Sequence, residues 1–577
     1  MSVMQTFSVN RKCVHGRFLR INDEFVMNKN IFLKVVIVGF LFSLFSFYGY
    51  AQKTKKVLSS PPSLVVGLII DQLRPDQIYK YWDKYSENGF KRLLTSGVEV
   101  KQASYNYYNT SLSTGNASII TGALPSSHGI VSCEWFELLN DKLVFCTDDP
   151  SVKAVGGSFE NGPFSPREIQ VSGFGDELKL SNRGYSKVFG IGLNHISSIL
   201  SSGQSADAAY WFDYNMGDWM TSTYYQEKLP AWLKSLNEKK MGDIYLDRTW
   251  EPLLKVEKSL EKKASANRSS RELFKSKSFP YDLAKLSNRG KEDRNYAWLK
   301  YTPFGNAITM DLALMLVMEE KLGKDKYPDY LAVNFNTMGS VAEVFGQESA
   351  EMEDLMIRFD IQLAHFIESI ENLLGKKNIL IYLTASRGMS KDMEYKKELN
   401  LQQGLFKRGQ ALSLLKSYLN VKYGKGKWVR GFYGNQIYLN RVLIEDSKIS
   451  LDEMRDQVAA FLVQFSGVSH AISASFLNSG SSVRGMAALV QNGYSQKRSG
   501  DVFLVLKPGW QMDSDNRNGT GYSFDRNVPL IWYGWRVNPT VIYRKIDMAD
   551  IAPTISILLN IPFPDASSGN PIMELFN

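Results

Sequence analysis

The sequence predicts an α/β protein with a central, mostly parallel sheet between layers of helices. Short and nearly continuous apolar runs recur along the chain, as is typical of strands buried on both faces. Amphipathic helical patterns separate these runs, which is the alternation expected of an α/β fold. With 577 residues, of which 44% are hydrophobic, the chain can also bury a large core.

The individual elements follow from these patterns. The helix with the clearest apolar stripe spans about Ser349 to Leu374, and a second helix is expected at about Ala549 to Leu559. The apolar runs assigned to core strands are Leu64–Ile70, Lys187–Leu193, Tyr330–Phe335, Ile379–Leu383, Val502–Leu506 and Pro529–Tyr533.

The first 51 residues have the features of a secretory leader. From Met27, a basic segment precedes an apolar run of about 14 residues, Val35 to Tyr48, and Gly49-Tyr50-Ala51 is a small-x-Ala cleavage signal. We expect translation to start at Met27, cleavage after Ala51, and export to the periplasm or envelope of a bacterium. An uncleaved anchor is the alternative, although the run is short of the about 20 residues that span a bilayer. No later segment approaches that length.

The exported chain divides into a core and one insertion. Residues 52–403 form the first part of the core, with a Lys-, Arg- and Ser-rich surface insertion at about 255–297. Residues 404–496 carry mixed helix and strand signals and predict an inserted α+β subdomain, after which 497–577 return to the core. The net charge of +9 is dispersed, which argues against nucleic acid as a partner.

Two cysteines follow the leader, Cys133 and Cys146. An Asn140-Asp141 turn signal lies between them, and a hairpin there would bring them together. In an oxidising compartment they could form a disulfide, and the alternative is two unpaired buried thiols. Histidine is scarce, which argues against a His-rich metal site; the chain has His15, His128, His195, His365 and His470.

Several segments carry a family resemblance in a fixed order: VVGLIIDQLRPD (65–76), GNASIITGALPSSHGIV (115–131), GQSADAAYWFD (203–213), TPFGNAITMDLA (302–313), RSGDVFLVLKPGW (498–510), GYSFDRNVPLIWYG (521–534) and DIAPTISILLNIPFP (550–564). Together they resemble the alkaline phosphatase superfamily. The match is to its periplasmic PafA-like phosphomonoesterase branch, which is related to the nucleotide pyrophosphatase/phosphodiesterases. The resemblance implies the sandwich fold of that superfamily. It also implies a site where two zinc ions clamp a phosphoryl group that a Thr or Ser hydroxyl attacks.

Matched residue by residue, the metal-ligand positions of the family hold mostly other side chains. Asp71 retains the first carboxylate ligand. The later Asp and His positions fall on Gly339, Glu343, Ser386, Arg387 and Asn518. Of these residues, only Glu343 has a side chain that commonly coordinates a metal ion. Arg387 is a cation where a dication should bind, and we expect it to pair with Asp71, because a buried carboxylate without its metal needs a compensating charge.

The positions for the nucleophile and for phosphate binding have changed as well. The Ala117-Ser118 anchor of the family's nucleophile motif places Leu112 at the nucleophile position. Ser113 or Thr114 would replace it only if the loop slid by one or two residues. The phosphate-binding positions fall on Cys133, Asn194 and Ile196, so the anionic clamp is missing.

These substitutions lead to one interpretation and two alternatives. We interpret the chain as a secreted pseudophosphatase that keeps the fold, needs no cofactor, and binds an envelope protein, a glycan or a small ligand. The first alternative is an active metal-dependent phosphomonoesterase or phosphodiesterase with a rebuilt site. That site would use Asp71, Glu343 and Thr114 with a single metal such as zinc, or acidic residues such as Asp513, Asp515 and Asp525. The second is a structural subunit of an envelope assembly.

Overall fold

The computed structural model describes residues 60–255, 278–288, 294–389, 403–480, 484–513 and 519–576. The expected leader, with Met27 and Ala51, lies outside these ranges, and so does most of the basic insertion. Within them, each helix is too short or too polar to cross a membrane.

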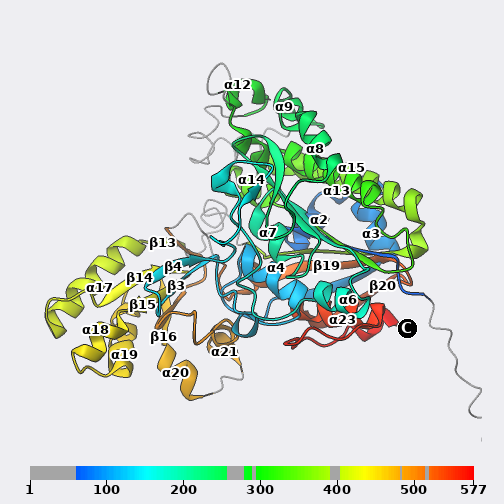
Figure 1. Cartoon of the computed structure of the whole chain (residues 1–577). Helices are drawn as coiled ribbons and strands as arrows, with labels where there is room; N and C mark the ends of the chain where they lie inside the picture. The colour runs from blue at the N-terminus through cyan, green and yellow to red at the C-terminus, as the bar shows by residue number, and fades with distance from the viewer. Residues whose placement is uncertain are drawn as a thin grey trace, which may run out of the picture. The chain divides into compact units, whose positions relative to one another are not determined.

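A ten-stranded sheet organises the core (Figure 1). Its five central strands run parallel; in spatial order they are β12 (Ile379–Ala385), β1 (Leu64–Ile70), β11 (Asp329–Phe335), β6 (Val188–Gly192) and β7 (Ala208–Asp213). The flanking strands are β19 (Asn527–Gly534), β2 (Val98–Ser104) and β20 (Thr540–Asp547) on one side and β8 (Asp218–Ser222) and β5 (Ala154–Val155) on the other. The mostly parallel sheet predicted from the apolar runs is therefore confirmed.

Helices cover both faces of this sheet. Phe335 of β11 packs on Phe359 of α15 (Ala350–Leu374), whereas Tyr330 of the same strand packs on Phe174 of α6 (Phe174–Ser181). Odd and even residues of a strand point to opposite faces, so α15 and α6 lie on opposite sides of the sheet (Figure 1). Further core helices are α3 (Phe90–Ser96), α4 (Leu112–Thr121), α7 (His195–Leu200), α13 (Pro303–Glu319), α14 (Thr337–Phe345) and α23 (Ile551–Leu559).

The parallel strands end together at one edge of the sheet. Ile70 of β1 is in register with Phe335 of β11 and with Ala385 of β12. The residues that follow these strands therefore leave the sheet at the same level. In open α/β sheets this is the edge where ligands bind.

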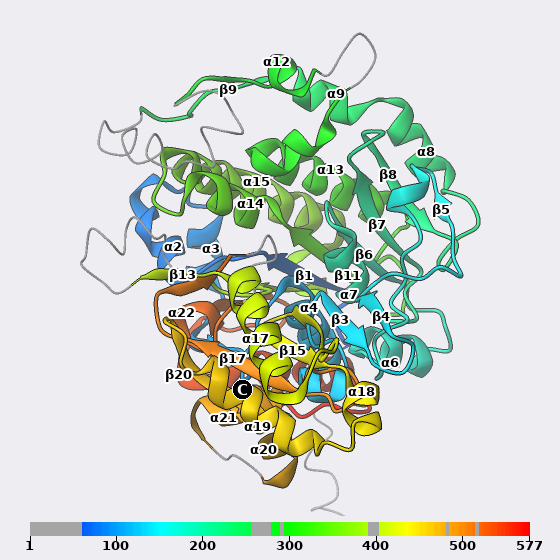
Figure 2. The same cartoon turned by 90° about the vertical axis from the view of Figure 1, so that its left-hand side faces the viewer.

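A second, four-stranded antiparallel sheet forms the centre of the inserted subdomain (Figure 2). Its strands are β14 (Val429–Tyr433), β15 (Gln436–Leu439), β17 (Val502–Leu506) and β16 (Val468–Ser473). The helices packed around it include α17 (Arg408–Tyr423), α19 (Leu451–Leu462), α20 (Ala474–Ser479) and α21 (Gly485–Asn492).

The position of β17 corrects the sequence analysis, which placed 502–506 in the core sheet. Leu504 packs in the cluster with Leu415 of α17, whereas Phe503 packs with Val490 of α21 on the other face. A strand covered on both faces is apolar at every position, whichever sheet it belongs to. The assignment to the core sheet was therefore wrong.

A β-hairpin links the core to the subdomain. Its strands are β3 (Glu134–Glu137) and β4 (Lys142–Phe145). Phe136 stacks on Tyr433 of β14 with ring centroids 6.5 Å apart, and Asp141 in the turn lies 3.0 Å from Arg430. The guanidinium of Arg498 lies 4.7 Å from the centroid of the Trp135 ring.

Asp501 joins β17 to helix α19 by a buried ionic contact. Its fully buried carboxylate accepts hydrogen bonds from the Leu439 N–H at 2.9 Å and from Arg455 at 2.8 and 2.9 Å. Arg441 donates to the same carboxylate at 3.0 Å. Two arginines thus share one buried carboxylate inside the subdomain.

Replacing Asp501 with Asn should lower the free energy of unfolding by about 3 kcal/mol, because the buried Arg455 guanidinium loses its countercharge. Urea denaturation monitored by circular dichroism measures the change. The matched control is Asp452→Asn: Asp452 pairs with the same arginine at 3.2 Å but is 70% exposed, so its loss should destabilise the protein far less. Equal losses of unfolding free energy in Asp501→Asn and Asp452→Asn would contradict the description of Asp501 as the buried countercharge of Arg455.

Candidate functional site

A buried ion pair lies at the carboxyl edge of the core sheet. Asp71 follows β1 and Arg387 follows β12. Arg387 Nε lies 2.9 Å from Asp71 Oδ1, and Arg387 Nη2 lies 3.2 Å from Oδ2. The Ser386 hydroxyl donates a further hydrogen bond to Oδ1 at 3.1 Å. The pairing expected from the sequence is confirmed, and Asp71 is only 6% exposed.

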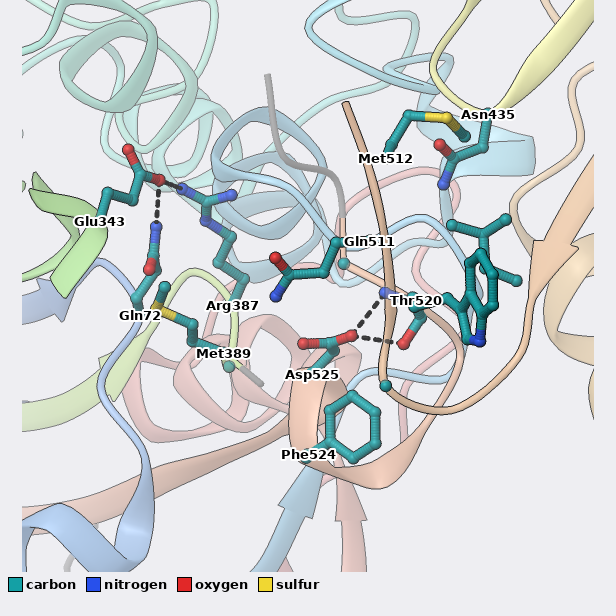
Figure 3. A pocket seen from close by; sticks show the side chains of 15 residues that line it. Gln72, Glu343, Arg387, Met389, Asn435, Gln511, Met512, Thr520, Phe524 and Asp525 are labelled. Carbon is teal, nitrogen blue, oxygen red and sulfur yellow. Dashed lines mark hydrogen bonds and ion pairs between the residues drawn. The ribbon is translucent and has the colours of Figure 1, made fainter. Parts of the chain in front are cut away.

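Glu343 of α14 approaches the same guanidinium from another side. Its Oε1 lies 3.6 Å from Arg387 Nη2 and accepts a hydrogen bond from Gln72 Nε2 at 2.9 Å (Figure 3). Burial works to lower the pKa of Arg387, but the charge and hydrogen bonds of Asp71 together with the charge of Glu343 raise it, so the guanidinium stays charged. Two carboxylates therefore share one cation.

Gly339 lets helix α14 approach Asp71 closely. A Cβ atom at Gly339 would lie 2.3 Å from Asp71 Oδ2, which is well inside van der Waals contact. The position where the resemblance implies an aspartate ligand thus has no room for a side chain while Asp71 points this way.

The start of helix α4 fixes Leu112, which the resemblance places at the nucleophile position. Ser111 caps the helix by accepting a hydrogen bond from the Thr114 N–H at 3.2 Å, and the Thr114 hydroxyl accepts one in return from the Ser111 N–H at 2.9 Å. A Cβ atom at Gly115 would lie 1.7 Å from the Ser386 carbonyl oxygen. Sliding the loop would bring a larger residue into that contact, so the register that exposes Ser113 or Thr114 is blocked; both are fully buried.

The three phosphate-binding positions have other local roles. The side chain of Asn194 caps α7 by accepting a hydrogen bond from the Ile196 N–H at 2.8 Å. Ile196 and Cys133 pack against an apolar cluster that includes Trp135. In the sequence, His195 lies between Asn194 and Ile196. Its ring stacks on Phe164 with centroids 3.9 Å apart, and burial lowers the pKa of His195 to about 4.

The two cysteines are free thiols in the structure, so the disulfide that the sequence analysis considered is not formed. The hairpin expected between them is present, and the Cys146 N–H donates to the Cys133 carbonyl oxygen at 2.9 Å. The two thiols affect each other's pKa, which is lowered for Cys133 and raised for Cys146. Cys133 Sγ also lies 3.4 Å from Ser113 Oγ.

A pocket opens beside the ion pair, with walls from both the core and the subdomain (Figure 3). The enclosed cavity measures about 50 Å³, and the rest of the pocket is open to solvent. The described lining residues are Gln72, Glu343, Arg387, Gly388, Met389, Asn435, Leu506, Gly509, Trp510, Gln511, Met512, Gly519, Thr520, Phe524 and Asp525.

The acidic residues near the last motif lie in different places. Asp525 lines the pocket and accepts hydrogen bonds from the backbone and the hydroxyl of Thr520 (Figure 3). Asp513 accepts one from the Arg408 N–H at the start of α17, at 2.7 Å. Asn518 and Asp515 lie outside the described residues. Sequence reasoning missed Gln72 and Trp510: both lie in segments that carry the resemblance, but the resemblance assigns neither of them a ligand or phosphate-binding role.

A double-mutant cycle tests the ion pair. Asp71→Asn should lower the free energy of unfolding by about 3 kcal/mol, because it leaves a buried guanidinium without its carboxylate. Combined with Arg387→Met, the cycle should give a coupling energy of about 2 kcal/mol by urea denaturation. The exposed pair Lys80–Glu348 (2.7 Å) is the control and should couple by less than about 1 kcal/mol. A coupling near zero between Asp71 and Arg387 would contradict the description.

Thiol labelling tests the cysteines. The hydrogen bond from Cys146 lowers the pKa of Cys133 more than burial raises it, whereas the pKa of Cys146 is raised. A lowered pKa means that the Cys133 thiolate forms at a lower pH than in an ordinary cysteine, and Cys133 is also the more exposed of the two. Iodoacetamide at neutral pH should therefore modify Cys133 first in the native protein, and both cysteines after unfolding without reductant. Labelling that requires a reductant would instead reveal a disulfide.

Comparison with known proteins identifies the family. Residues 65–528 match the family described as type I phosphodiesterase / nucleotide pyrophosphatase. The chain is 34% identical over 537 residues to a Myroides odoratus protein named calcium-transporting ATPase (92% of this chain, 97% of that one). It is also 34% identical over 534 residues to alkaline phosphatase PafA of Elizabethkingia meningoseptica (91% and 96%). The crystal structure of PafA superimposes with a TM-score of 0.82 at 32% identity, over 90% of this chain and 99% of that chain. The chain therefore belongs to the type I phosphodiesterase / nucleotide pyrophosphatase family and has the alkaline phosphatase fold.

Proposed function

We propose that the protein is an exported member of this family that has lost phosphatase activity and binds a ligand in the cleft at the carboxyl edge of the sheet. The observation that carries the proposal is the bidentate contact of Arg387 with Asp71. A guanidinium occupies the place that the resemblance assigns to a metal dication, and it engages both oxygens of the one retained ligand.

The donor atoms support this proposal. A binuclear zinc site needs several deprotonated ligands that converge in fixed geometry. Among the described residues, no group of three or more His, Cys, Asp or Glu side chains could hold a metal ion. Around Asp71, the ligand positions carry Gly339, Ser386 and Arg387, and these side chains do not fit the two zinc ions of the family.

The reacting groups support it as well. A leucine side chain has no atom that can attack phosphorus, and the hydroxyl of Thr114 is held in the cap of helix α4. The three phosphate-binding positions carry no positive charge. Hydrolysis would therefore lack both its nucleophile and its anion clamp.

The alternative is an active metal-dependent phosphomonoesterase or phosphodiesterase with a rebuilt site. The name of the relative PafA favours it, since that protein is an alkaline phosphatase. In this case zinc or another metal would have to displace Arg387 from Asp71. Export to the periplasm or envelope is part of both proposals and is supported by the leader pattern that ends at Ala51.

Metal analysis and activity assays on residues 52–577 distinguish the two proposals. We expect no stoichiometric zinc, no hydrolysis of an aryl phosphate or an aryl phosphodiester, and no rise in melting temperature with added zinc, because only a ligand that binds the native state stabilises it. PafA prepared in the same buffer is the positive control. Two tightly bound zinc ions per chain together with turnover would establish the alternative.

A further inference from the structure

Gln72 places an unsatisfied hydrogen-bond acceptor beside the pocket. The residue is 3% exposed, and its Nε2 donates to Glu343 Oε1 at 2.9 Å. This contact fixes the orientation of the amide, because a carbonyl oxygen would be repelled by the carboxylate. Gln72 Oε1 is then buried without a hydrogen-bond donor. Buried acceptors are normally paired, so a donor from outside the described residues is expected here.

Glu343 places excess negative charge beside that acceptor. Asp71 takes the two short contacts of Arg387, and Glu343 Oε1 lies farther away at 3.6 Å. Glu343 Oε2 takes part in no hydrogen bond or ion pair with the described residues. The side chain of Glu343 is 35% exposed, so this oxygen is available to a ligand.

The walls of the pocket suit an organic cation better than a phosphate. Its lining includes two carboxylates, Glu343 and Asp525, and the aromatic side chains of Trp510 and Phe524. Arg387 is the one cationic side chain among the described lining residues, and two carboxylates already share it. Glu343 would repel an anionic ligand, and Arg387 already pairs with two carboxylates among the described residues.

We propose that this pocket binds a small ligand through a primary ammonium group. The ammonium donates hydrogen bonds to Glu343 and to Gln72 Oε1, and the rest of the ligand lies towards Trp510 and Phe524. An ammonium supplies a hydrogen-bond donor to Gln72 Oε1 and a positive charge to the Glu343 carboxylate. The inference rests on the proposed function, in which the cleft binds rather than hydrolyses.

Isothermal titration calorimetry with matched probes tests the proposal. Glucosamine and glucose differ only in the exchange of an ammonium for a hydroxyl, and N-acetylglucosamine removes the charge while keeping the nitrogen. We expect glucosamine to bind, and glucose, N-acetylglucosamine and inorganic phosphate to bind at least about tenfold more weakly. Ethanolamine and ethylene glycol repeat the comparison for a smaller ligand.

Variants of the full exported chain locate the site. Glu343→Gln should weaken glucosamine binding by about tenfold or more, because it removes the carboxylate charge but keeps the side-chain shape. Gln72→Met removes the acceptor and should weaken binding in the same direction. The control is Glu348→Gln, which changes a carboxylate that pairs with Lys80 and does not line the pocket. Melting temperatures establish that each variant is folded.

The outcomes separate the two proposals. Equal binding of glucosamine and glucose, tighter binding of phosphate, or no heat with glucosamine and ethanolamine would each overturn the ammonium site. An equal effect of Glu343→Gln and Glu348→Gln would do the same. The proposed function fails separately, if the same preparation contains zinc and hydrolyses the aryl esters.

Discussion

The contact between Asp71 and Arg387 is the interaction on which the site depends. It is possible because β1 and β12 are neighbouring parallel strands that end in register, so the residues after them meet at one level. Each partner alone would be a buried charge, and such a charge is costly without a counterion. Together the two charges compensate each other at the carboxyl edge of the sheet. Helix α14 then approaches through Gly339.

The same segment also constrains the start of helix α4. The carbonyl oxygen of Ser386 lies against Gly115, while the hydroxyl of Ser386 donates to Asp71. The helix cap at Ser111 and the ion pair are thus joined through two consecutive residues, Ser386 and Arg387. A shift of the backbone at Ser386 would move both the ion pair and the start of helix α4, because the close contact at Gly115 leaves no space between them. Leu112 and Arg387, which the resemblance places at the nucleophile and metal-ligand positions, thus lie in one closely packed arrangement.

Much of the core could be predicted from the sequence, because strands buried on both faces read as continuous apolar runs; β1, β11 and β12 are examples. The pairing of Asp71 with Arg387 could be predicted because the resemblance puts both residues at one site and a buried carboxylate needs a countercharge. The sheet to which β17 belongs could not, since its apolar pattern reports burial and not the identity of its neighbours. The pocket was also missed, because Gln72, Asn435 and Trp510 come from distant segments and their meeting depends on how the subdomain packs. Whether the two cysteines form a disulfide depends on the positions of their sulfur atoms, which spacing along the chain does not determine.

The hairpin of β3 and β4 has a consequence for how the pocket meets a ligand. Its contacts through Phe136 and Asp141 join the core to β14, and residues of both parts form the pocket walls. The separation of these walls is therefore set before any ligand arrives. Little conformational entropy remains to be lost on association, so most of the contact energy is expressed as affinity. For the ammonium ligand proposed above, walls held in this way would add selection by size to selection by charge.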